Sequence, residues 1–225
     1  MNKKLLFVIA IVCLLVFTGC SNKNNNNKYA LDFKEEYESL NGKTNKSGKE
    51  HRKVSIDTNN PFEKITASEL LKKLENKETF YVYFGDKLCP WCRSVIEKAI
   101  EVANKNNIDK IYYVAIWDDE GNEILRDKYE LKDDEIVKVN EGIEEYQELL
   151  KYFKSVLNDY TLNDSDGNKI GVGEKRIYAP NFIYVEDGKA IRITEGISSL
   201  QKDSREELTD EILNDEEELF EEFFK

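Results

Sequence analysis

The fold of this chain is decided by two adjoining runs, Phe80-Tyr81-Val82-Tyr83-Phe84 and Leu88-Cys89-Pro90-Trp91-Cys92-Arg93. The first run is apolar on both faces, which is typical of a central strand covered by helices. After the cysteines, apolar residues recur at helical spacing as far as Ala103, so a helix follows the strand. Pro90 then takes the first helical position, where its missing N–H costs nothing. The Cys89 sulfur would face the positive end of this helix, which favours a reactive thiolate.

A second continuous apolar run, Ile111 to Trp117, comes after the helix. Strand, helix and strand at this spacing predict two parallel strands joined by a right-handed crossover. Ahead of the first strand, Thr66 and Glu69 match a capping box that begins a helix over residues 67–75. Together these elements predict an α/β fold with a central mixed sheet and helices on both of its faces.

Residues 119–160 are predicted to be a helical insertion between this βαβ unit and a C-terminal β-hairpin. The segment is charged at first, and residues 143–157 then show the spacing of an amphipathic helix. The acidic run 163–168 looks like a calcium loop but lacks the ligand spacing of an EF-hand, so we interpret it as a polar turn.

The predicted hairpin follows Pro180, with strands over residues 182–185 and 190–194 and a turn at Asp187-Gly188. A proline at the first residue of a strand is sterically allowed, and the Ala179–Pro180 bond is a candidate cis peptide. The acidic C-terminal segment carries an apolar stripe that should cover one face of the sheet. This stripe consists of Leu208, Ile212, Leu219, Phe220 and Phe223.

The N-terminus has the pattern of an export signal over residues 1–19. Lys3 and Lys4 precede an apolar run from Leu5 to Phe17, which is shorter than the ~20 residues that span a bilayer. A retained transmembrane helix is therefore the weaker interpretation. The ending Thr18-Gly19-Cys20 resembles a bacterial lipobox, which implies that Cys20 is lipid-modified and anchors the chain to the extracytoplasmic face of the cell membrane.

Residues 20–61 are rich in Asn, Lys, Ser and Gly and are predicted to be a polar tether, with the folded domain over residues 62–225. A short helix over residues 29–37 and an extended piece at 54–56 are expected within the tether. The net charge of −12 argues against a nucleic-acid partner, because binding to phosphates requires a basic surface.

The domain is left with two cysteines, because Cys13 would leave with the signal and Cys20 would carry lipid. Zinc needs about four ligands, and the one histidine, His51, lies in the predicted tether, so no metal site is expected. That placement also argues against Cys–His nucleophilic catalysis. The context of strand before and helix after favours a redox dithiol at Cys89 and Cys92, with a purely structural pair as the alternative.

The order of elements from Ile65 to Lys225 resembles the thioredoxin fold. More narrowly, Cys89–Arg93, Gly173–Arg176 and Ala179–Pro180 resemble the membrane-anchored thioredoxin-like lipoproteins of Gram-positive bacteria, some of which are described as bacteriocin-transport accessory or disulfide-isomerase-like proteins.

This resemblance implies that Cys89 is the nucleophile, that Cys92 resolves the mixed disulfide, and that a Cys89–Cys92 disulfide forms on oxidation. Trp91, Ala179 and Pro180 would contact the substrate, and no cofactor is implied. Two features depart from thioredoxin itself. Tyr83 stands where thioredoxin has a buried acid, six residues before the first cysteine, and the dipeptide between the cysteines is Pro-Trp.

Two functions follow as expectations. The leading one is an extracytoplasmic thiol–disulfide oxidoreductase that acts on protein thiols and disulfides, with a membrane redox donor or an exporter as candidate partners. The alternative is a non-catalytic thioredoxin-fold lipoprotein, in which the insertion around residues 146–157 and the acidic C-terminal helix dock a membrane exporter. Arg93 and Arg176 are candidates for positive potential near the thiols, with surface roles as the alternative.

Overall fold

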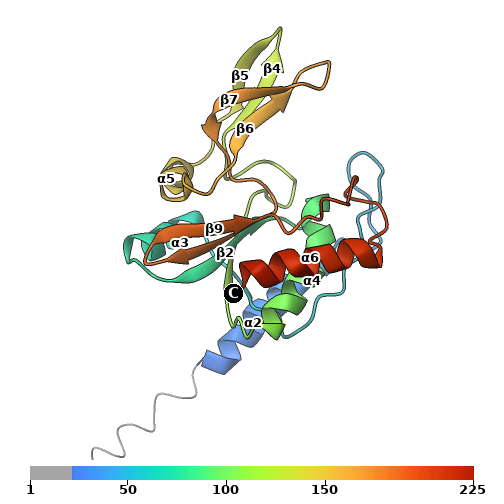
Figure 1. The fold of residues 1–225 in the computed structure, drawn as a ribbon, viewed down its shortest axis with the longest axis vertical. Coiled ribbons are helices and arrows are strands. Elements are labelled where there is room, and N and C mark those ends of the chain that lie inside the picture. The colour runs from blue at the N-terminus through green and yellow to red at the C-terminus, as the bar shows by residue number, and fades with distance from the viewer. Residues whose placement is uncertain (1–21) are drawn as a thin grey trace, which may run out of the picture.

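The computed structural model describes residues 22–225, so the predicted export segment and the lipidation site Cys20 lie outside the described residues. Five strands form a mixed sheet in the order β1–β3–β2–β8–β9 (Figure 1). Their bounds are β1 Phe62–Lys64, β2 Phe80–Gly85, β3 Ile111–Ala115, β8 Asn181–Glu186 and β9 Lys189–Thr194. Strands β1, β3 and β2 are parallel, and the β8–β9 hairpin joins β2 in the antiparallel sense.

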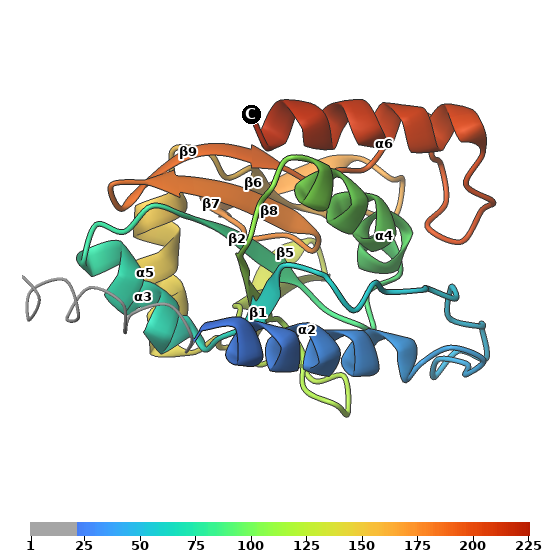
Figure 2. The same ribbon diagram turned by 90° about the horizontal axis from the view of Figure 1, so that it is seen from below.

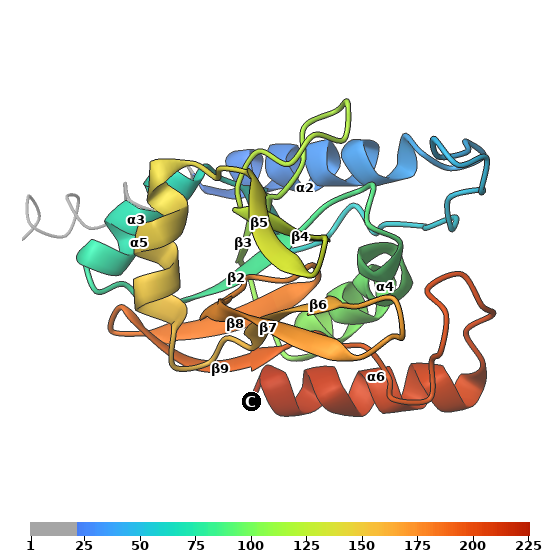
Figure 3. The same cartoon turned by 90° about the horizontal axis from the view of Figure 1, so that it is seen from above.

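Helices cover both faces of this sheet (Figures 2 and 3). On one face, α4 (Pro90–Lys105) lies beside α6 (Asp210–Phe223), and α2 (Asn22–Glu38) packs into the same core. On the other face, α3 (Ala67–Glu75) lies beside α5 (Glu144–Phe153). Within β2 the side chains alternate, so that Tyr83 belongs to the first core while Val82 and Phe84 belong to the second. The expected α/β architecture is therefore present.

Local signals in the sequence account for the element boundaries that were predicted best. Helix α3 spans the predicted residues, and both halves of its capping box form, since Thr66 Oγ1 accepts from the Glu69 N–H at 3.2 Å and Glu69 accepts from the Thr66 N–H at 2.8 Å. Helix α4 begins at Pro90, as predicted. None of the helices within residues 22–225 is long and apolar enough to cross a membrane.

The short helix expected over residues 29–37 is present as part of α2, but the prediction of a tether is wrong from Ala30 onward, because side chains of this region pack on the domain. Helix α2 buries Phe33 and Tyr37, which lie one turn apart, and the Phe33 ring stacks on Phe62 of β1 with centroids 4.3 Å apart. Val54 is also buried in this core. A few aromatic side chains at helical spacing are enough to dock the segment, although its average composition is polar.

The helical insertion predicted over residues 119–160 also needs correction. Helix α5 matches the predicted helix closely, but its buried residues Tyr146, Leu149 and Phe153 pack on the core shared with α3, so it is a layer of the fold. The additions are two hairpins that project from the sheet (Figure 1), and they extend to residue 175. They consist of β4 Lys128–Lys132 with β5 Glu135–Asn140, and β6 Asp159–Asn163 with β7 Lys169–Lys175.

The acidic run between β6 and β7 forms a turn, as the sequence predicted. Asp164 Oδ1 accepts hydrogen bonds from the backbone N–H groups of Asp166 at 2.9 Å and Asn168 at 2.8 Å. The carboxylate is therefore used to close the turn.

Candidate active site around Cys89 and Cys92

Strand β2 and helix α4 place the two cysteines at the carboxyl end of the parallel strands. Cys89 is the N-cap of α4, and its sulfur accepts a hydrogen bond from the Cys92 N–H at 3.3 Å. Cys89 is 4% exposed and Cys92 is fully buried one turn below it. Neither cysteine is in a disulfide in this structure.

The surroundings of the two sulfurs push their pKa values in opposite directions. Burial by itself would raise the pKa of Cys89, but hydrogen bonds from the Cys92 side chain and from the Cys92 and Trp91 N–H groups outweigh it, so the Cys89 pKa is lowered. Burial raises the pKa of Cys92 well above its ordinary value, and the hydrogen bond to Cys89 and the charge of the Cys89 thiolate raise it further. The first thiol is thus prepared to attack, and the second stays protonated.

The loop before β8 closes over Cys89. The Ala179–Pro180 peptide bond is cis, which is the isomer proposed from the position of Pro180. The Cys89 sulfur lies 3.4 Å from the Ala179 carbonyl oxygen, to which its S–H can donate. Asn181 holds the loop by accepting from the Tyr178 N–H at 2.7 Å. Trp91, in the first turn of α4, and Ala179 are partly buried against the core that holds both cysteines, and Pro180 is buried next to Ala179 in the same loop.

A buried acid near the thiols was missed by the sequence prediction. Asp86 is 2% exposed, accepts from the Leu88 N–H at 2.9 Å and the Trp117 N–H at 3.4 Å, and its backbone carbonyl accepts from the Cys89 N–H at 3.2 Å. Burial raises the pKa of Asp86 to about 6, even though both backbone hydrogen bonds lower it. In its charged form it raises the pKa of Cys89. The sequence signal is an aspartate that can close an Asx turn just after β2.

Tyr83, six residues before Cys89, lies in the same buried core as the two cysteines. Its hydroxyl lies 2.8 Å from the Tyr37 hydroxyl, and both side chains are fully buried. A hydrogen bond between Tyr83 and Cys92 partly offsets the raised pKa of Cys92. A Cβ on Gly85 would lie 2.0 Å from the Tyr83 hydroxyl oxygen, so the Tyr83 ring requires glycine two residues later.

Neither arginine proposed as a source of positive potential has a surface role. Arg93 is fully buried and donates to the Arg52 and Tyr37 carbonyls at 2.7 Å and to Asn41 Oδ1 at 2.9 Å. It therefore ties the segment after α2 to the helix of the cysteines. Arg176 lies at the base of the hairpins, where it donates to the Asp127 carbonyl at 2.7 Å.

A groove of about 440 Å³ opens beside Cys89. One wall is formed by residues 40–51, which the sequence assigned to the tether, and the other by residues 117–121 after β3. His51 lines this groove and is buried, and burial followed by the charges of Arg93 and Arg205 lowers its pKa, which keeps the ring neutral at pH 7.

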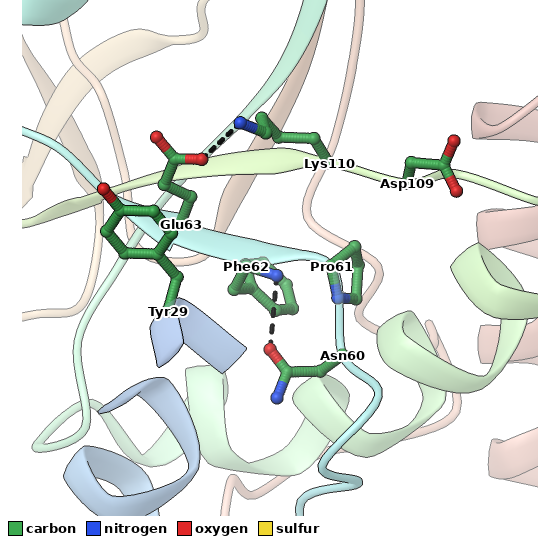
Figure 4. A pocket seen from close by; sticks show the side chains of 7 residues that line it. All are labelled: Tyr29, Asn60, Pro61, Phe62, Glu63, Asp109 and Lys110. Carbon is green, nitrogen blue, oxygen red and sulfur yellow. Dashed lines mark hydrogen bonds and ion pairs between the residues drawn. The ribbon is translucent and has the colours of Figure 1, made fainter. Parts of the chain in front are cut away.

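A second hollow lies at the other end of the parallel strands, between α2, β1 and the start of β3 (Figure 4). Its volume is about 10 Å³, which is the size of one water molecule. Its polar groups bind one another, since Lys110 pairs with Glu63 and Asn60 Oδ1 accepts from the Phe62 N–H at 3.2 Å. This hollow is part of the packing of α2 on the sheet.

Within residues 22–225, no group of three or more His, Cys, Asp or Glu side chains is arranged to hold a metal ion. No protein-family model matches the chain, and a comparison with curated proteins finds no significant match.

Proposed function

We propose that this chain is a thiol–disulfide oxidoreductase of the thioredoxin fold that acts on protein disulfides. The observation that carries the proposal is the asymmetry of the pair: Cys89, at the N-cap of α4, has a lowered pKa, and Cys92 beneath it has a raised one. The fold gives further support, because the sheet has helices on both faces and the loop before its hairpin brings the Ala179 carbonyl oxygen to 3.4 Å from the Cys89 sulfur.

The reaction follows from this geometry. The Cys89 thiolate attacks one sulfur of a substrate disulfide, the substrate S–S bond breaks, and a substrate thiolate leaves and takes up a proton. Cys92 then loses its proton and attacks the Cys89 sulfur, which releases the second substrate thiol and forms the Cys89–Cys92 disulfide. Two electrons pass from the protein dithiol to the substrate, and a dithiol reductant must restore the starting state.

We further propose that the protein works at the extracytoplasmic face of the cell membrane, held by a lipid on Cys20. The support is the sequence alone, an apolar run of export length that ends in Gly19-Cys20. Replacing Cys20 with Ala should release the protein into the medium or leave it unprocessed. Unchanged fractionation and gel mobility would contradict the anchor.

One observation favours the alternative of a non-catalytic interaction protein, although on a different surface from the one first expected. The face of α5 around Tyr146 is buried in the core and is not free to dock a partner. Strand β5, however, exposes Ile136, Val137 and Val139 on a projecting hairpin. An exposed apolar strand of this kind suits contact with another protein.

Reduction of insulin by dithiothreitol separates the two functions. The oxidoreductase should accelerate the reaction, Cys89→Ser should abolish the acceleration, and Cys92→Ser should accumulate a mixed disulfide that mass spectrometry detects. Activity that survives Cys89→Ser would refute the enzymatic function. Wild-type protein without any activity would favour the interaction protein.

A further inference from the structure

We propose that residues 40–53 form a substrate-selecting wall beside Cys89, and that this wall favours protein substrates with acidic side chains next to the reacting cysteine. The inference rests on the proposed oxidoreductase function and adds the class of substrate. Such a preference requires that substrates pass through the groove, that the wall is held in place, and that the positive charge of the wall is not already neutralised by ion pairs.

The groove offers an approach to Cys89. Only 4% of Cys89 is exposed and it lines the groove, so a substrate sulfur that enters there can reach it. The floor and sides next to the sulfur are apolar, with Leu40, Leu88, Pro90 and Trp117 among the lining residues. A peptide segment with an apolar residue beside its cysteine would bury that residue against this surface.

The wall is held to the domain by hydrogen bonds from several directions. Its two arms pair through the Thr44–Glu50 bridge and through the His51 N–H, which donates to the Lys43 carbonyl at 2.9 Å. Its far end is fixed by Arg93, which donates to the Arg52 carbonyl. Lys46 Nζ reaches across the groove to the Glu120 carbonyl of the opposite wall at 2.7 Å.

The charge of this wall is opposite to that of the protein. Five Lys or Arg residues and one Glu lie between Gly42 and Lys53, in a chain whose net charge is −12. Lys43, Lys46 and Lys49 are exposed, and within the described part of the chain no carboxylate lies within ion-pair distance of their ammonium groups.

The opposite wall carries three acids, Asp118, Asp119 and Glu120, but Asp119 is already paired. Asp119 forms an ion pair with Lys87 at 2.5 Å. Asp118 and Glu120 are thus the acids of that wall without an ion-pair partner among the described residues, and the three unpaired lysines of the first wall outnumber them. A substrate carboxylate that approaches along the first wall is attracted to it, and this attraction raises the rate of encounter more than the final affinity.

Disulfide-linked peptide dimers test the inference. Each of three peptides contains a Leu-Cys pair, flanked by glutamates in the first, by serines in the second and by lysines in the third. The protein is first reduced with dithiothreitol, and the dithiothreitol is then removed. The rate at which this protein reduces each peptide disulfide is measured in a single turnover. The rates are divided by the rate of each peptide with dithiothreitol alone, which removes differences in intrinsic reactivity. At low ionic strength the glutamate peptide should react about tenfold or more faster than the lysine peptide, and this ratio should shrink toward one at high salt.

Charge removal on the protein gives the second arm. The triple variant K43Q/K46Q/K49Q should lose most of the preference, whereas K72Q/K169Q/K189Q, with the same charge change at exposed lysines outside the groove, should keep it. Equal normalised rates for the three wild-type reactions would overturn the inference even if the triple variant fails to fold. If the three rates are equal but the reduction still requires Cys89, the proposed oxidoreductase function is retained. If no reduction requires Cys89, both the substrate preference and the oxidoreductase function are refuted.

Discussion

Replacing Arg93 with Met should detach the segment after α2 from the domain. The buried guanidinium donates to the Arg52 carbonyl and the Asn41 side chain of that segment, and to the Tyr37 carbonyl in the last turn of α2. Methionine fills a similar volume but donates nothing, so the two carbonyls lose this partner, while Asn41 Oδ1 still accepts from the Val54 N–H at 3.0 Å.

The size of the effect follows from the acceptors that are left unpaired. Each buried carbonyl without a hydrogen bond costs about 1–3 kcal/mol, and the substitution removes this donor from two of them. We therefore expect the free energy of unfolding to fall by about 3–5 kcal/mol, a large part of the ~5–15 kcal/mol that stabilises a typical domain. The free energy of unfolding of Arg93→Lys should lie between those of the wild type and Arg93→Met, because one ammonium group reaches fewer of these acceptors.

Urea denaturation measures this loss, and limited proteolysis within residues 40–53 reports whether the segment has come free. Lys105→Met, on the exposed side of the same helix, is the matched control and should leave the midpoint close to that of the wild type. An Arg93→Met variant with a wild-type midpoint and an uncleaved segment would show that the segment does not depend on this guanidinium.

Three further predictions concern single groups around the thiols and in α6. Tyr83→Phe removes the hydroxyl that lowers the pKa of Cys92, so the mixed disulfide with substrate should persist longer in a quenched-flow experiment; an unchanged lifetime would argue against this hydrogen bond. Asp86→Asn removes a charge that raises the pKa of Cys89, so alkylation of Cys89 by iodoacetamide should reach its half-maximal rate at a lower pH, and an unshifted profile would contradict the coupling. Burial raises the pKa of the fully buried Glu216 to about 8, from an ordinary value of 4.5. Between about pH 5 and pH 8 the Glu216 carboxyl is therefore protonated in the folded chain but ionised in the unfolded chain. The free energy of unfolding should consequently fall on the order of 4 kcal/mol as the pH rises from about 5 to 9. Urea midpoints measured across this pH range should fall much less in Glu216→Gln than in the wild type. An equally steep fall in the variant would show that other groups cause the pH dependence.

The parts of the fold that the sequence predicted well are those with strong local signals. Continuous apolar runs mark β2 and β3, a capping box marks the start of α3, and Pro90 marks the start of α4. Each signal acts within one turn or one strand, so no knowledge of the tertiary structure is needed to interpret it.

The parts that were missed depend on contacts between distant segments. Phe33 and Tyr37 look isolated in a polar region until β1 and β3 supply the surface on which they pack. The spacing of α5 shows that one face is buried but does not show which surface buries it. The strands of the projecting hairpins have little buried surface, so apolar and polar residues alternate only weakly in their sequences.

The candidate site divides in the same way. The cysteines, Trp91 and the proline loop follow from spacing and from the resemblance, whereas Asp86 is an ordinary turn residue until burial raises its pKa to about 6. The groove beside Cys89 could not be predicted, because one of its walls comes from residues 40–51, about forty residues earlier in the chain.

The measurement that tests the dithiol most directly is a redox titration of the protein in glutathione and dithiothreitol buffers. The fraction of Cys89 and Cys92 that resists alkylation is measured by mass spectrometry at each potential. A redox-active pair predicts one reversible two-electron transition with a midpoint between about −300 and −120 mV, which Cys92→Ser abolishes. Two thiols that stay reduced across this range, or that oxidise independently of each other, would contradict the proposed function.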